Sequence, residues 1–220
     1  METFNPEKSK PEIYFPEVRA IIESEKFLRD GQKALASMDD KKDALRHSQR
    51  ITNMGYLLHK HLGITSVDEK QFVEICLLHD IGKKDIPPKH LTRQFDKFSP
   101  KDMEAVRKHV RTGYMELKQA GRSPRVYNAV LLHHQFQAKS YPKIGAEFRE
   151  IEPADVDNAR LLAILDVFDT CAFGRSYVGI EALPIDEAKK KLMSLFDQPG
   201  DEAVINFLAS QYETVKKLFI

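Results

Sequence analysis

Long apolar runs and a signal peptide are both missing from this sequence. No segment approaches the roughly 20 apolar residues that a membrane-spanning helix requires. The first residues, METFNPEKSKPE, contain no apolar stretch of the kind that directs secretion. We therefore expect a cytoplasmic protein that has no membrane partner.

An excess of one charge is also missing, because 34 basic and 33 acidic residues leave a formal net charge of +1. A protein that binds a nucleic-acid polymer usually carries a strongly basic surface, so we expect no such partner. A small anionic ligand, such as a nucleotide, requires only a few local cations and is compatible with this balance.

Cysteine is scarce, with Cys76 and Cys171 as the two cysteines of the chain. Both occur in apolar segments of helical spacing, and no CxxC motif is present. We therefore expect buried, reduced thiols rather than a disulfide or a metal-binding pair.

The sequence is rich in apolar residues at helical spacing, and it has no convincing alternating strand pattern. This predicts an all-α fold, an irregular multi-helix bundle with an N-terminal helical extension over residues 1–40 and a main domain over residues 41–220. Helices are expected near residues 16–38, 41–62, 67–79, 101–119, 124–134, 158–173, 185–196 and 202–218. Residues 135–157 are the least regular segment, and a loop of this length is usually functional or mobile.

The expected N-terminal helix over residues 16–38 has a narrow apolar seam at Ile21, Leu28 and Leu35, and Gly31 weakens it. We expect this seam to pack on the main domain. A homodimer formed through the same seam is the alternative.

Histidine and aspartate interrupt several segments that otherwise look buried. A lone histidine on an apolar helix face is usually a hydrogen-bonded core residue, and a lone buried aspartate is usually a cap or an ion-pair partner. This sequence offers few buried cations to pair so many polar groups, whereas one metal cluster would satisfy them together. The candidate ligands are His47, His79, Asp80, His109, His133, His134 and Asp166.

The order of these residues resembles the metal-binding signature of the HD superfamily, and in particular its HD-GYP branch, the cyclic-di-GMP phosphodiesterases and their relatives. Two stretches carry the resemblance: LLHDIGKKDIPPKHL at residues 77–91 and LAILDVFDTCAFGRSY at residues 162–177. The similarity covers about residues 40–210.

The resemblance implies two divalent transition-metal ions, with Fe or Mn favoured over Ni or Zn. Asp80 would bridge the two ions, and a hydroxide between them would attack phosphorus. The first ion would be held by His47, His79, Asp80 and Asp166, and the second by Asp80, His109, His133 and His134.

The same resemblance assigns substrate contacts. Lys83 and Arg175 would bind phosphate oxygens, with Lys83 also counted as catalytic beside Asp80, and Tyr141 would contact the substrate. Without the motif, Lys83 and Arg175 would be interpreted as solvated surface cations.

Asp43 stands four residues before His47, so the two share a helix face. Some family members place a glutamate there as a ligand of a third metal. A carboxylate in the first turn is equally well explained by the helix dipole, and the two interpretations stay open.

The loop after the paired histidines departs from the family. In HHQFQAKSYPKIG, at residues 133–145, Tyr141-Pro142 is kept, but Ser140 replaces the glycine and the preceding glycine run is absent. Val178 occupies a position where the family often has a second basic residue. These changes concern substrate contacts and not the expected metal ligands.

Three functions follow for comparison. The first is a phosphodiesterase of a cyclic dinucleotide such as cyclic-di-GMP. The second is a non-catalytic nucleotide sensor or scaffold that keeps the metal site. The third is a simpler HD phosphohydrolase of nucleotide monophosphates, which the paired His133-His134 disfavours.

Overall fold

The computed structural model describes residues 14–38, 43–87, 90, 98–136, 139–145, 150–175 and 180–219, with the side chain of Asp43 excepted. Within these residues every regular element is helical, and a single isolated antiparallel bridge joins Arg175 and Ile180. The expected all-α fold is confirmed. Among the described helices, none is both long enough and apolar enough to cross a membrane.

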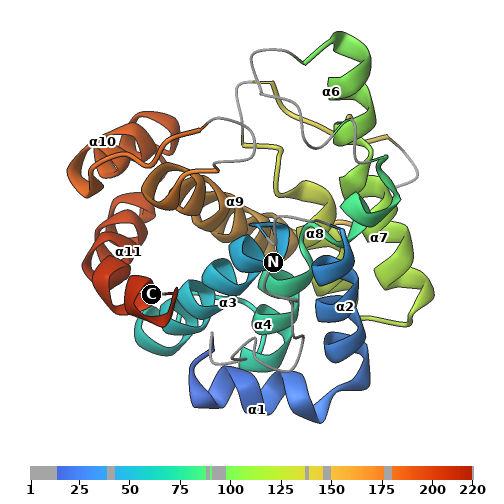
Figure 1. The fold of residues 1–220 in the computed structure, drawn as a ribbon, viewed down its shortest axis with the longest axis horizontal. Helices are drawn as coiled ribbons and strands as arrows, with labels where there is room; N and C mark the ends of the chain where they lie inside the picture. The colour runs from blue at the N-terminus through green and yellow to red at the C-terminus, as the bar shows by residue number, and fades with distance from the viewer. Residues whose placement is uncertain are drawn as a thin grey trace, which may run out of the picture.

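The centre of the bundle is formed by four helices (Figure 1). These are α3 (Asp43–Leu62), α4 (Glu69–Leu78), α8 (Pro124–Leu132) and α9 (Pro153–Phe173). Consecutive residues of α4 from Phe72 to Leu78, and most of α9 from Asn158 to Phe168, are buried. A helix that is apolar on all sides must be surrounded by others, which explains the central positions of α4 and α9.

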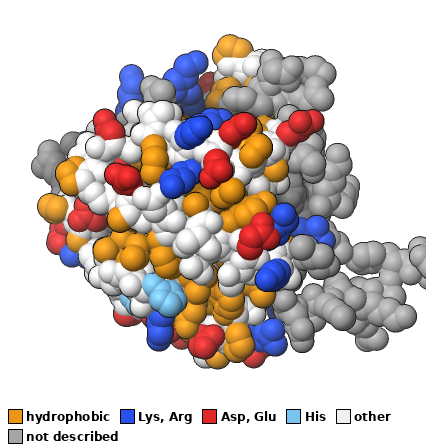
Figure 2. Space-filling model, turned by 90° about the vertical axis from the view of Figure 1, so that its left-hand side faces the viewer, with side chains coloured by type: hydrophobic (Ala, Val, Ile, Leu, Met, Phe, Trp, Pro, Cys, Tyr) orange, Lys and Arg blue, Asp and Glu red, His pale blue; other side chains and the backbone are white. Residues whose placement is uncertain are grey.

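The remaining helices cover this centre. On one side, α10 (Ile185–Leu195) and α11 (Asp201–Lys216) pack on each other and on α9, and the short 3-10 helix η6 (Lys217–Phe219) follows α11. Figure 2 looks onto that side, where side chains of both charge signs are interspersed with apolar ones. The expected helices over residues 185–196 and 202–218 are confirmed to within two residues at each end.

The N-terminal segment differs from the expected single helix. It forms α1 (Pro16–Ser24) and α2 (Lys26–Ser37), and the break lies at Glu25, whose backbone is extended. Gly31 lies inside α2, where a Cβ atom would overlap the side chain of Leu78. The glycine therefore allows α2 to pack closely against Leu78.

The apolar seam of this segment packs within the chain. Leu28 and Leu35 are fully buried, and α2 contacts α3 and α4. The expectation that the segment packs on the main domain is confirmed.

The expected helix over residues 101–119 is likewise two helices, α6 (Pro100–Arg107) and α7 (His109–Gln119). The interruption falls at Lys108. It coincides with a close approach of the 3-10 helix η2 (Ile81–Asp85), because a Cβ atom at Gly82 would overlap the carbonyl oxygen of His109. Gly82 therefore lets the two backbones meet beside a predicted metal ligand.

Helix starts and stops explain two further boundaries. The helix expected from residue 158 begins at Pro153, because the side chains of Glu152 and Asp155 form a capping box that the irregular composition of the loop concealed. At the end of α3, Gly63 has a φ of 59°, a conformation that glycine adopts without strain.

Both cysteines are free and buried, as expected. Burial raises the pKa of the Cys76 thiol and of the Cys171 thiol.

Candidate metal centre

The structure brings together seven predicted ligands from separate parts of the chain. The ligand atoms of His47, His79 and Asp80 lie within 4.8 Å of one another, and Asp166 Oδ1 lies 3.1 Å from His47 Nε2. We call these four residues the His47 group. A second set, in which the ligand atoms also lie within 4.8 Å of one another, is the His109 group: His109, His133 and His134.

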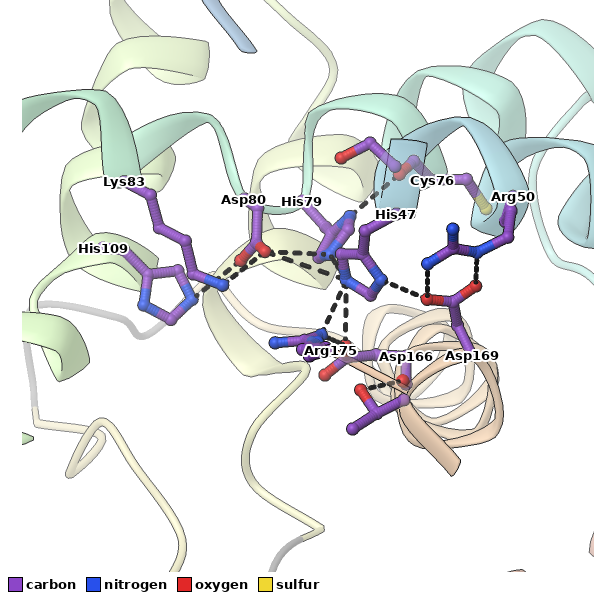
Figure 3. Close-up of polar contacts among 12 residues, drawn as sticks. His47, Arg50, Cys76, His79, Asp80, Lys83, His109, Asp166, Asp169 and Arg175 are labelled. Carbon is purple, nitrogen blue, oxygen red and sulfur yellow. Dashed lines mark hydrogen bonds and ion pairs between the residues drawn. The ribbon is translucent and has the colours of Figure 1, made fainter. Parts of the chain in front are cut away.

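Asp80 lies between the two groups. Its Oδ2 is 3.4 Å from His79 Nε2 and 3.9 Å from His47 Nε2. Its other oxygen, Oδ1, is 3.3 Å from His109 Nε2. Each oxygen of this carboxylate therefore faces a different group, which is the arrangement that a bridging ligand requires (Figure 3).

Helix ends orient three of the histidines. The last carbonyl groups of a helix have no partner within the helix, and histidine can donate to them. His79 donates from Nδ1 to the Cys76 carbonyl at 2.9 Å, His109 to Val106 at 2.7 Å, and His133 to Val130 at 2.7 Å. These carbonyls lie in the last turns of α4, α6 and α8.

The consequence of this pattern is that each ring is fixed with Nδ1 protonated and Nε2 turned toward the cluster. A hydrogen bond to one ring nitrogen sets the tautomer and leaves the other nitrogen for a metal. The three histidines reach this arrangement through the same i−3 contact, at three different helix ends.

His47 is oriented differently, by a carboxylate. Its Nδ1 donates to Asp169 Oδ2 at 2.6 Å, and Asp169 is fully buried. Arg50 donates to both oxygens of the same carboxylate, from Nε at 2.5 Å and from Nη2 at 2.8 Å.

Several buried nitrogen atoms of the cluster lack a hydrogen-bond partner among the described residues. They are His109 Nε2, His133 Nε2 and His134 Nδ1. In addition, the Nε2 atoms of His47 and His79 lie 3.2 Å apart, so both are directed into the same small space of the cluster. Buried polar atoms normally have partners. A shared cation satisfies all these atoms, and mixed imidazole and carboxylate ligands suit divalent transition metals.

Electrostatics agrees with this fit. Burial is the main cause that lowers the pKa of His109 to about 4 and that of His133 to about 3. Lys83 and His79 contribute to the lowering at His109, and His109 and His79 contribute to it at His133. Burial, followed by His133 and His109, also holds the pKa of His134 well below its usual value. These rings are neutral near pH 7, and only a neutral imidazole can bind a metal.

The acids of the cluster are ionised. Burial opposes the charge of Asp80, but Lys83 and His79 hold its pKa well below the usual value. Burial likewise opposes the charge of Asp166, and Arg175 and His47 hold its pKa low. At His79 burial lowers the pKa, but Asp80 and Asp166 outweigh burial and raise it. The two carboxylates therefore favour a positive charge beside His79.

A cleft of about 360 Å³ opens onto this cluster. Asp166, His109 and His134 contribute to its lining, as do Lys83 and Arg175. We call the buried cluster the floor of the cleft. Three basic side chains, which we call the rim, also line it: Arg107 from the end of α6, Lys139, and Lys191 from α10.

The two predicted phosphate-binding cations lie beside the acids of the floor (Figure 3). Lys83 Nζ contacts Asp80, three residues earlier in the turn after α4. Arg175 Nη2 donates to Asp166 Oδ1 at 2.7 Å and to His47 Nε2 at 2.8 Å. Gly174, with a φ of 70°, redirects the chain after α9 and so places Arg175 here.

Tyr141 completes one wall of the cleft. Its ring stacks on that of His134, with centroids 4.5 Å apart, and Arg107 Cζ lies 5.3 Å from the centroid of the Tyr141 ring. Arg111 donates to the Lys143 carbonyl at 2.8 Å and so holds the segment. Burial raises the pKa of Tyr141, so the phenol stays protonated and can donate.

Two residues named in the sequence analysis lie outside the described part of the structure: the side chain of Asp43 and the whole of Val178. The role of Asp43 as a ligand of a third metal therefore stays a prediction. His90, which is not one of the candidate ligands, contacts Asp102 at 2.5 Å and thereby supports the start of α6.

Sequence reasoning missed Asp169, Arg50 and the rim. A signal for the first two was present, because Arg50 follows His47 by three residues and Asp169 follows Asp166 by three. Residues three apart share a helix face, so each functional residue had a charged neighbour on its own buried stripe. The rim left no such signal, since isolated surface cations are common.

The fold and the cluster together match a known class. The family described as HD domain matches residues 44–171, which is more than half of the chain. The protein belongs to the HD-domain family, and the resemblance drawn from its sequence is confirmed.

Two curated relatives make the comparison more specific. A protein of Thermotoga maritima named "Cyclic di-GMP phosphodiesterase" is 26% identical over 181 residues, covering 80% of this chain and 47% of that protein. The "Cyclic di-GMP phosphodiesterase response regulator RpfG" of Xanthomonas campestris pv. campestris is 30% identical over 159 residues, covering 69% of this chain and 38% of that protein. The chain thus spans less than half the length of either relative.

A solved structure shows the same fold. The HD domain of the L. monocytogenes phosphodiesterase PgpH superimposes with a TM-score of 0.58 and 13% sequence identity, covering 84% of this chain and 98% of that one. At this identity the likeness concerns the fold alone.

Proposed function

We propose that this chain is a metal-dependent phosphodiesterase that hydrolyses a cyclic dinucleotide, cyclic-di-GMP or a relative of it. The HD-domain match and the names of the two curated relatives support the reaction class. The substrate is the more specific part of the proposal, and it depends on the cleft.

One observation carries the proposal. Neutral, buried imidazole nitrogens without partners among the described residues converge with two ionised carboxylates at the floor of an open cleft, and basic side chains surround them. A structural core has no need of such a set, since leaving buried polar atoms unpaired costs stability. A site that binds divalent cations and a phosphate ester needs all of its members.

The metal ions would be held by the His47 group and the His109 group, with Asp80 shared. When bound, they would supply Lewis-acid activation of the phosphate and a water nucleophile at neutral pH. Fe or Mn is the metal that we propose, on the strength of the resemblance.

The chain's own cations would bind the substrate. Lys83 and Arg175 line the cleft while touching Asp80 and Asp166, so each can turn toward a phosphate oxygen without crossing the site. Arg175 offers a planar pair of donors, whereas Lys83 offers a point charge. Tyr141 would donate its hydroxyl to the substrate or stack on a base.

Hydrolysis of a panel of substrates tests the proposal. Purified protein is incubated with Mn²⁺ or with Fe²⁺ under anaerobic conditions, and products of cyclic-di-GMP, other cyclic dinucleotides, GMP and bis(p-nitrophenyl) phosphate are separated by chromatography. We expect linear dinucleotide or mononucleotide products from a cyclic dinucleotide. Absence of turnover of every diester by metal-loaded protein contradicts the proposal, and turnover of GMP alone favours the simpler phosphohydrolase.

A second candidate is a sensor that binds the nucleotide without cleaving it. The observation that favours it is Ser140, which is exposed and directly precedes Tyr141 in place of a glycine. A side chain there restricts the close approach of a ligand to the backbone. Calorimetric binding of cyclic-di-GMP by metal-loaded protein, without products after long incubation, supports the sensor.

A further inference from the structure

Asp169 and Arg50 lie directly behind His47, on the side away from the ligand atoms (Figure 3). Arg50 donates hydrogen bonds to both carboxylate oxygens of Asp169, and Asp169 accepts a hydrogen bond from His47 Nδ1. All three side chains are buried. Arg50 and Asp169 do not line the cleft, but they fix the orientation of the His47 ring and so the direction of its Nε2 atom.

The pair is itself fixed in place. The Cζ atom of Arg50 lies 4.8 Å from the ring centroid of Phe173 and 5.7 Å from that of Phe219. Arg50 donates to both oxygens of the Asp169 carboxylate, which is fully buried. Loss of the Arg50 contact would leave the Asp169 carboxylate buried without its cationic partner, which costs free energy.

This support distinguishes His47 from the other oriented histidines. His79, His109 and His133 donate to neutral carbonyls, whereas His47 donates to a carboxylate. A carboxylate acceptor increases the basicity of the opposite ring nitrogen and holds the ring more firmly.

The other ligands also favour stronger cation binding by the His47 group than by the His109 group. The His47 group contains two carboxylates, Asp80 and Asp166, whereas the His109 group consists of three imidazoles and reaches only the bridging oxygen of Asp80. A divalent cation gains more from ionised oxygen ligands and a strengthened imidazole than from neutral imidazoles alone.

We propose that Asp169, clamped by Arg50, is a positioning residue that makes the two metal positions unequal, so that the His47 group binds its ion more tightly than the His109 group. This inference rests on the metal centre of the proposed function, but it does not depend on the substrate.

A stepwise metal titration tests it. Metal-free protein is titrated with Mn²⁺ and with Co²⁺ in competition with a chromophoric chelator, and the wild-type chain is expected to show two unequal steps. Asp169→Asn should weaken the tighter step about 10- to 100-fold and leave the weaker step unchanged. The Co²⁺ absorption bands of the tighter step should shift, because the ligand field of His47 changes.

Two further variants identify the cause. Arg50→Lys keeps the charge but contacts one oxygen at most, so it should weaken the same step by less than Asp169→Asn does. His109→Gln should weaken the other step and thereby assign each step to its group. Should Asp169→Asn fail to fold, Arg50→Lys carries the same test.

Glu74→Gln is the matched control. Glu74 is another buried carboxylate gripped by an arginine through Nε and Nη2, in this case Arg122. This variant should lose unfolding free energy comparable to that lost by Asp169→Asn while both metal steps stay unchanged.

The outcomes separate this inference from the proposed function. Asp169→Asn with both steps unchanged, or with both weakened equally, overturns the inference. A wild-type chain that binds two ions unequally but hydrolyses no phosphodiester contradicts the proposed function and leaves the inference intact.

Discussion

The floor of the cleft and its rim are built in different ways. The floor is buried, and its ligands are fixed at helix ends and on the faces of α3 and α9 by short hydrogen bonds. The rim consists of single cations from three unrelated segments, and Lys139 and Lys191 are exposed. We therefore expect few amino-acid substitutions to be tolerated in the floor, whereas single residues of the rim can be substituted without disturbing the fold.

The difference locates chemistry and substrate choice in different parts of the molecule. Every predicted ligand that the structure describes lies in the floor, and Ser140, where the chain departs from the family, is exposed and outside it. We therefore expect substitutions in the floor to affect all substrates alike, and substitutions in the rim to affect only a substrate large enough to reach it.

The largest effect is expected from Asp80→Asn. Asp80 faces both groups, one through each oxygen, so its loss weakens both metal positions. Because about 4 kcal/mol of transition-state stabilisation corresponds to about a thousandfold in rate, kcat should fall about 10³-fold for cyclic-di-GMP and for bis(p-nitrophenyl) phosphate alike. Steady-state kinetics and metal analysis measure this. A selective loss for one substrate would contradict the division between floor and rim.

The next effect is expected from Lys83→Gln. Lys83 lies in the cleft beside Asp80, and a charge-assisted hydrogen bond contributes about 1.5–3 kcal/mol. Activity should fall about 10- to 100-fold with both ions still bound. Lys84→Gln is the control, because Lys84 pairs with Glu116 outside the cleft, and it should retain wild-type kinetics. Equal losses in the two variants would remove Lys83 from the mechanism.

Gly82→Ala tests how strictly the backbone constrains the floor. A Cβ atom at this position would overlap the His109 carbonyl and lie 2.6 Å from the Gly113 nitrogen, and backbone atoms cannot yield as a side chain does. We expect a loss of about 1–3 kcal/mol in the free energy of unfolding and weaker metal binding by the His109 group. Gly121→Ala, where no atom is crowded, should lose stability through its φ of 68° alone and bind metal normally.

The smallest effect is expected from Arg107→Ala in the rim. Arg107 packs over Tyr141, and its Nε is buried without a partner among the described residues. The KM for a cyclic dinucleotide should rise about tenfold, which corresponds to about 1.4 kcal/mol, while hydrolysis of bis(p-nitrophenyl) phosphate stays unchanged. Lys108→Ala, an exposed neighbour, is the control. Equal losses for both substrates would place Arg107 in the floor.

Much of the floor could be predicted from the sequence because its ligands interrupt apolar runs. His79-Asp80 and His133-His134 each follow a run of buried aliphatic residues, and Asp166 lies inside one. A polar residue in such a run contradicts the local pattern, and that conflict is a signal of function.

The parts that escaped prediction depend on contacts between distant segments. The break at Lys108 coincides with the approach of Gly82 to His109, and the position of Gly31 against Leu78 is a tertiary contact as well. Local periodicity contains no information about either. Glu152 and Asp155 are an exception, because their spacing, with Pro153 at the first helical position, marks a helix start that the irregular composition of the loop concealed.

The placement of histidines at the ends of α4, α6 and α8 has a consequence for the chain as a polymer. Ions bound by these histidines together with His47 and Asp166 would connect native segments that run from residue 47 to residue 166. A ligand that binds only the native state also raises its apparent stability with concentration. The melting temperature of the loaded protein should therefore depend on the free metal concentration, although its hydrophobic core stays the same.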